Sequence, residues 1–138
     1  QDGREEVVSA ENFFKNAAKT DKIFSHVSIP INKDVKVAYT RVKKSANVDI
    51  PLLAVCIKTT LKDKRFTNTR VSVNNGTAFA QRDHKLEDFL NTQTCHEKFE
   101  WEALDHLDTE IYDKRSDDYK KHMFRISLKN ALLEIMQK

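Results

Sequence analysis

The chain has 138 residues and a formal net charge of +3, with 39% hydrophobic and 33% charged residues. This length predicts one domain with a buried core, and the composition is typical of a globular protein. No uncharged run is long enough to span a bilayer and no signal-peptide pattern opens the sequence, which excludes a membrane span. Two cysteines without metal-site or disulfide spacing favour a cytoplasmic location. The start at Gln1 rather than Met indicates a trimmed or processed chain.

The charge is divided unevenly along the chain. Residues 1–70 carry fourteen Lys and Arg against eight Asp and Glu, whereas residues 71–138 carry ten against thirteen. A basic half can suit a polyanion. No aromatic-plus-basic recognition motif accompanies it, so nucleic acid is not expected as a partner.

The first third predicts a short helix and two strands. Ser9 is a candidate N-cap for a helical turn over "AENFFKN". The alternation in "IFSHVSIP", residues 23–30, predicts a strand that ends at Pro30. "VKVAYTRV", residues 35–42, is a second strand candidate.

A hairpin follows. "DIPLLAVCIKTTL" is continuously apolar at its start and alternates later, which predicts a strand covered first on both faces and then on one. "KDK", residues 62–64, is the turn into "RFTNTRVSVNN", where Thr67, Thr69, Val71 and Val73 are expected to share a face. Gly76 supplies the positive φ of the strand exit.

The remainder is predicted to be helical. Asp83 caps "HKLEDFLN", and from Glu97 an apolar repeat predicts a second helix, marked by Phe99, Ala103, Leu107 and Ile111 with Trp101 and Leu104 beside it. Ser116 is the expected cap of a long third helix. Its predicted apolar face is Tyr119, Met123, Ile126, Ala131, Leu132 and Ile135. Strands followed by helices predict an α+β fold: a two-layer sandwich of a three- to four-stranded antiparallel sheet with about three helices on one face.

Spacing alone predicts no catalytic machinery. The five histidines make no metal-ligand pair, and no nucleophile elbow, phosphate-binding glycine loop or dinucleotide motif is present. The acids between Glu100 and Glu110 are interpreted as a solvated helix face.

Three places remain as candidate sites. Arg41, Lys43 and Lys44, with Asp49 after them, either form a solvated loop or hold an anion. Residues 41 and 43 of a strand point the same way, about 7 Å apart. The second place is residues 113–116 with Tyr119 and His122, interpreted as a structural lock. The third is the polar loop at residues 74–77 beside Arg82, which is either an interface patch or a turn.

At these places the sequence resembles the C-terminal domain of the FAD-binding subunit of molybdenum hydroxylases, the family of carbon monoxide dehydrogenase and xanthine dehydrogenase. The resemblance rests on "AYTRVKKSANVDIPLLAV", on "TRVSVNNGTAFAQR" and on "DKRSDDYKKHMFRISLKNALLEI". The opening "REEVVSAENFFKNAAKTDKIFSHVSIP" is similar to the crossover that leaves the preceding flavin-binding region. The sequence departs from the family at Asn74, Asn75 and Pro51, where glycine or another small residue is common.

The resemblance implies a fold and a role. It implies an antiparallel sheet with three helices, in a subunit that passes electrons between iron–sulfur clusters and an external acceptor through FAD. Residues 1–30 would be the crossover and residues 31–138 the C-terminal domain. The expected partners are N-terminal FAD-binding domains and iron–sulfur and molybdopterin subunits. The isolated chain is not expected to catalyse a reaction, and it is expected to bind FAD weakly or not at all.

The same resemblance assigns cofactor contacts to Tyr39, Arg41, Lys43, Lys44 and Asp49. A cation beside the reduced isoalloxazine would stabilise its anionic form and raise its potential. The alternative is a stand-alone interaction or assembly module without a redox role.

Overall fold

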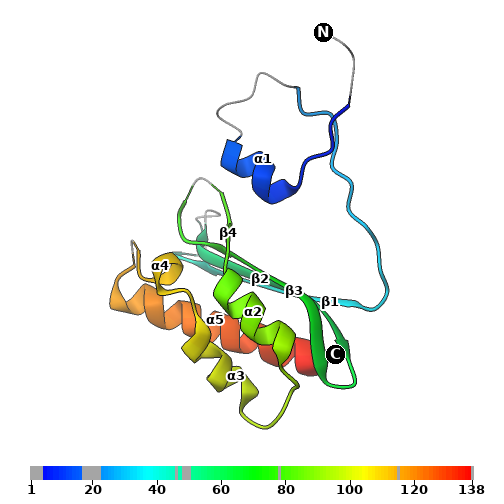
Figure 1. Ribbon diagram of the computed structural model, residues 1–138. Helices are drawn as coiled ribbons and strands as arrows, with labels where there is room; N and C mark the ends of the chain where they lie inside the picture. Colours follow the sequence, from blue (N-terminus) through cyan, green and yellow to red (C-terminus); the bar gives the residue numbers. More distant parts are fainter. Residues whose placement is uncertain are drawn as a thin grey trace. The chain divides into compact units, whose positions relative to one another are not determined.

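The computed structural model describes residues 5–16, 23–45, 47, 51–77, 79–114 and 116–137. The chain forms two compact units, Gln1–Ile31 and Asn32–Lys138, which are coloured from blue to cyan and from cyan to red in Figure 1. The expected assignment of residues 1–30 to a crossover stays a prediction, because a compact unit does not reveal what precedes it.

The first unit contains helix α1 (Ala10–Asn16). Its predicted cap is confirmed, since the Asn12 backbone N–H donates to Ser9 Oγ at 3.3 Å. The strand predicted over residues 23–30 is wrong, because these residues are irregular. Ile23 and Ile29 are 88% and 78% exposed. No strand among the described residues pairs with this segment, so its alternating apolar side chains are not buried against a sheet.

The second unit is built on a four-stranded antiparallel sheet, ordered β1-β2-β3-β4. The strands are β1 (Val35–Lys43), β2 (Pro51–Lys62), β3 (Arg65–Asn74) and the short β4 (Gln81–Arg82). The predicted turn at residues 62–64 is confirmed. Asp63 and Lys64 have φ values of 50° and 63°, the two positive values that suit a tight hairpin.

An irregularity at Asn68 changes which face the β3 side chains occupy. Asn68 has φ 52°, and the pairing with β2 shifts between Lys58 and Thr60. As a result Thr67 pairs with Thr60 and is half-buried, whereas Thr69 is fully buried. The prediction that Thr67 shares the face of Thr69 is therefore wrong, because one extra residue reverses the alternation.

The helices lie on one face of this sheet (Figure 1). They are α2 (His84–Thr92), α3 (Phe99–Glu102), the 3-10 helix η2 (Ala103–His106), α4 (Thr109–Tyr112) and α5 (Asp118–Gln137). Helix α5 packs on β1 and β2, and α2 packs on β3. The core between the layers includes Leu53, Val55, Ile57, Phe66, Val71, Leu90, Phe99, Phe124, Leu128 and Leu132. The predicted α+β sandwich is confirmed.

The single helix predicted from Glu97 onward is instead three short pieces. Leu107 is extended, with ψ 143°, and Asp108 restarts the chain as the N-cap of α4, accepting from the Glu110 backbone N–H at 3.3 Å. The Asp108 backbone N–H donates to the buried carboxylate of Asp83 at 3.2 Å. This tertiary hydrogen bond replaces an intrahelical one. The apolar repeat is therefore divided among three short helices instead of lying on one long helix.

The predicted long helix is present as α5, but its cap and part of its buried face differ from the prediction. The Lys120 backbone N–H donates to Asp117 Oδ1 at 2.7 Å, so Asp117 rather than Ser116 caps α5. Ala131, Leu132 and Ile135 of the predicted apolar face are fully buried, which confirms its C-terminal part. Earlier in the helix Tyr119 is 59% exposed, and Phe124 and Leu128, which were not predicted, are fully buried instead.

Candidate functional site

The face of the sheet opposite the helices carries two of the sequence-predicted site residues, Tyr39 and Arg41. We call it the outer face and define it by the strand residues that point away from the core. Antiparallel partners share a face, so the register gives its rows. The middle row consists of Tyr39, Cys56, Ser72 and Arg82. The row on one side of it consists of Arg41, Ala54 and Asn74. The row on the other side consists of Val37, Lys58 and Arg70.

Tyr39 and Arg41 are brought together on this face by β1, the edge strand. Tyr39 is 57% exposed and Arg41 is exposed. They are two strand positions apart, roughly 7 Å. Their cross-strand neighbours, Cys56 and Ala54, have small side chains. The ring of Tyr39 and the guanidinium of Arg41 therefore lie beside a part of the sheet surface that large side chains do not cover.

The other predicted site residues are placed less closely. Lys43 ends β1 just after a shift in register and is half-buried, and Lys44 is exposed in the bend that follows. Because of this register shift, the alternation that places Tyr39 and Arg41 on the outer face does not extend to Lys43. Asp49 lies outside the described residues.

The outer face is strongly cationic. Its positive side chains are Arg41, Lys58, Lys62, Arg65, Arg70 and Arg82. All four strands lie within the described residues, and none of their outer-face residues is Asp or Glu. Five of the fourteen Lys and Arg residues of positions 1–70 therefore lie on this one surface, which attracts anions.

Glu87 of α2, which is 2% exposed, lies at the β3 edge of the sheet. It accepts from the Val71 backbone N–H at 2.9 Å and from Arg82 Nε at 2.9 Å, and its second oxygen accepts from Arg82 Nη2. Arg70 Nη1 lies 3.8 Å from it. A buried carboxylate is stable only with such partners, so Glu87 has a structural role at the β3 edge.

Asp83 anchors a second buried group. One oxygen accepts from the Leu86 backbone N–H at 2.9 Å, which confirms the predicted cap of α2, and the other accepts from the Tyr112 hydroxyl at 2.8 Å. Burial, and then the Asp83 charge, raise the pKa of Tyr112 well above 10.0. The tyrosine is therefore a fixed hydrogen-bond donor at neutral pH.

The second and third predicted places are joined by one side chain. Asn75 is 3% exposed. Its Nδ2 lies 3.0 Å from the Ile111 carbonyl oxygen, 2.8 Å from that of Lys114 and 3.1 Å from Ser116 Oγ. The loop at 74–77 thus locks the turn before α5 through Asn75, whereas the sequence predicted a lock formed within residues 113–116 themselves. Arg115 lies outside the described residues.

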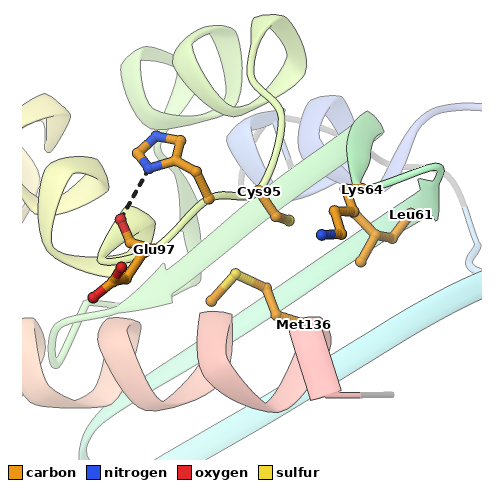
Figure 2. Close-up of a pocket in the computed structure, with 6 residues that line it drawn as sticks. Leu61, Lys64, Cys95, Glu97 and Met136 are labelled. Atoms are coloured by element: carbon orange, nitrogen blue, oxygen red, sulfur yellow. Dashed lines mark hydrogen bonds between the residues drawn. The ribbon is translucent and has the colours of Figure 1, made fainter.

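Two small cavities occur in the described part of the chain. One, of about 240 Å³, is lined by Leu61, Lys64, Cys95, His96, Glu97 and Met136 (Figure 2). The other, of about 210 Å³, is lined by Asn75, Thr77, Gln81, Ile111 and Lys114. Both are smaller than the roughly 300–1,000 Å³ of typical ligand sites.

The thiols are not activated. Burial raises the pKa of Cys95 beside the first cavity and of Cys56 on the outer face, and thiolate is the reactive form. Among the described residues no three His, Cys, Asp or Glu side chains gather as metal ligands. No helix in this part of the chain is long and apolar enough to cross a membrane.

Comparison with known proteins agrees with this architecture. No protein-family model and no curated protein matches the sequence, but solved structures do. Carbon monoxide dehydrogenase from Hydrogenophaga pseudoflava, in a form that lacks the Mo-pyranopterin moiety of the molybdenum cofactor, matches with a TM-score of 0.63 and 20% identity. Quinoline 2-oxidoreductase from Pseudomonas putida 86 matches with 0.62 and 16%. The cyanide-inactivated form of Cu,Mo-CO dehydrogenase matches with 0.57 and 13%.

The chain has the fold of one part of these oxidoreductase chains. The matches cover 78%, 79% and 76% of this chain but only 38%, 39% and 38% of the solved ones. At these identities the similarity shows the fold alone. The neighbours are consistent with the molybdenum hydroxylase resemblance seen in the sequence.

Two residues with central roles were not predicted. Glu87 lies between Leu86 and Leu90, so an acid on the apolar face of α2 was the available signal. Asn75 is predicted only as part of a polar loop, and no sequence pattern indicates that its amide reaches residues 36 to 41 positions away.

Proposed function

We propose that this chain is the C-terminal domain of the FAD-binding electron-transfer subunit of a molybdenum hydroxylase-type oxidoreductase. The observation that carries the proposal is a fold shared over 76–79% of the chain with carbon monoxide dehydrogenase and quinoline 2-oxidoreductase. The ordered sequence motifs support it independently. Its partners would be FAD-binding domains and iron–sulfur and molybdopterin subunits.

The residues present fit contact with one edge of a flavin rather than binding of the whole cofactor. FAD is larger than either of the two cavities described above, which measure about 240 and 210 Å³. Tyr39 and Arg41 offer a ring and a cation on an exposed surface, which suits a cofactor that is held mainly by another domain. FAD would supply the electron-transfer chemistry, and this chain would position and tune it.

Within this proposal each residue has a defined part. Tyr39 would pack against the planar ring system, and Arg41 would place positive charge where the reduced flavin is negative. Lys43, Lys44 and Asp49 would border that contact. The low side chains of Ala54 and Cys56 leave room for a flat group beside Tyr39.

The deciding experiment is the intact mass and visible absorbance of the native protein that contains this sequence. A larger polypeptide that co-purifies with FAD is expected. The 138-residue chain alone should bind added FAD weakly or not at all. Sub-micromolar binding of FAD to this chain would contradict the proposed division of labour.

The alternative, an interaction or assembly module without a redox role, is favoured by one observation: the exposed outer face of the sheet is rich in Lys and Arg, as a surface that binds an acidic partner would be. A native protein without flavin that elutes in a complex would support it. The same mass and absorbance measurement therefore separates the two functions.

A further inference from the structure

The tip of the β2–β3 hairpin concentrates positive charge in an unusual way. Lys58 pairs directly with Arg70, and Lys62 pairs directly with Arg65. We call these four residues the hairpin cluster. Both pairs lie on the outer face, and their rows are four strand positions apart, about 13 Å.

This arrangement is unfavourable for the isolated fold. Like charges directly opposite each other destabilise a sheet, and here two such pairs occur in one hairpin. Arg70 is partly compensated, because its Nη1 lies 2.9 Å from the Thr69 carbonyl oxygen and 3.8 Å from Glu87. For Lys58, Lys62 and Arg65, the structure gives no ion pair with any described residue, and all three are exposed.

From this uncompensated charge we propose that the hairpin cluster is a docking site for an acidic, carboxylate-rich surface of another protein. The inference goes beyond the proposed function, since the cluster lies toward the opposite end of the outer face from Arg41. Carboxylates opposite the four cations would relieve the cross-strand repulsion and complement the charge of the face. The site is complete only when such a partner is bound.

A protein surface is favoured over a nucleic acid because the cluster has no base-stacking residue. Single-strand binders combine a basic groove with aromatic side chains on which bases stack. Between the two cation pairs the outer face presents Thr60 and Thr67 instead. Threonines flanked by Lys and Arg suit hydrogen bonding and ion pairing with a protein partner.

The test uses the 138-residue chain and two anionic probes, a polyglutamate peptide of about twenty residues and an oligothymidylate of equal length. The variant is Lys58→Glu with Lys62→Glu, which places a carboxylate opposite Arg70 and another opposite Arg65. The matched control is Lys121→Glu with Lys129→Glu on α5, which changes the net charge equally. Affinity is measured by fluorescence anisotropy at two salt concentrations.

The wild-type chain should bind polyglutamate more tightly than oligothymidylate, and less tightly as salt is raised. The hairpin variant should lose about tenfold or more in affinity, while the control should stay close to wild type. The thermal unfolding midpoint of the hairpin variant should equal or exceed that of wild type, because two repulsive cross-strand pairs become attractive.

Three results would overturn the proposal. Unchanged binding by the hairpin variant would place the site elsewhere. Equal losses in the variant and the control would mean that only net charge matters. Tighter binding of oligothymidylate would identify a nucleic-acid surface instead.

Discussion

The carboxylate of Glu87 substitutes for a missing strand beside Val71. Its Oε1 lies 2.9 Å from the Val71 backbone nitrogen, at an edge where β4 pairs only with Ser72 and Val73. Two residues earlier, Asn91 Oδ1 accepts from the Thr69 backbone N–H at 2.8 Å. Helix α2 therefore satisfies alternate donors of the β3 edge with side chains, which protects an otherwise open edge.

Glu87→Ala is expected to lower the free energy of unfolding by about 2–4 kcal/mol, because it leaves a buried N–H and the Arg82 guanidinium without their acceptor. Glu87→Gln should cost less, since an amide oxygen can still accept from Val71. Urea unfolding measures both. Glu110→Ala, at an exposed position on α4, is the control and should change little; equal effects at both positions would contradict the role of Glu87.

Asn75→Ala should destabilise the chain by roughly 1–3 kcal/mol, because the carbonyl oxygens of Ile111 and Lys114 and Ser116 Oγ lose their donor. The loss should be concentrated at the turn before α5, so amide exchange of residues 111–114 should accelerate more than that of the β2 core. The exposed Asn47→Ala is the control. A uniform increase in exchange across the domain would argue against a local lock.

Gly76→Ala tests backbone strain separately from packing. Gly76 has φ 65°, and an added Cβ would meet only the Lys120 Nζ atom, at 3.9 Å. The cost should therefore be about 1 kcal/mol from the left-handed conformation alone. Gly76→Asn should cost less, because asparagine tolerates this region. Chemical denaturation of both variants checks the order, and the reverse order would point to a steric cause.

Tyr112 makes stability depend on alkaline pH. Its folded-state pKa is raised, mainly by burial, from the ordinary 10.0. Its contribution is therefore complete below about pH 10 and is lost as pH rises from there toward the folded-state pKa. Tyr112→Phe should cost about 1–2 kcal/mol at neutral pH and should flatten the alkaline loss. Tyr119→Phe, at a 59% exposed position, should leave the pH profile of urea unfolding unchanged.

Arg41→Ala tests the proposed flavin contact in the native flavoprotein. Removal of positive charge beside the reduced flavin should lower its midpoint potential by roughly 30 mV, which is about 1.4 kcal/mol for a two-electron couple. Lys129→Ala on α5 is the control for net charge. Spectroelectrochemical titration measures both, and equal potentials for wild type and Arg41→Ala would remove Arg41 from the site.

The sequence alone determined the fold class and most of the elements, because they depend on local periodicity and local caps. The alternation of β2, the Asp63–Lys64 turn and the Asp83 cap each involve residues within a few positions of one another. These signals are complete within one window of the chain. The resemblance to molybdenum hydroxylases likewise followed from motifs in order, and the solved structures agree with it at the level of fold.

Only the tertiary structure decided which faces and side chains serve which role. The bulge at Asn68 moved Thr67 to the outer face, and the Asp83 carboxylate broke a predicted helix at Asp108. Pairing of β2 with β3 placed Lys58 opposite Arg70, although twelve positions separate them in sequence. Long-range hydrogen bonds and strand register arise when the chain packs, and no local pattern carries them.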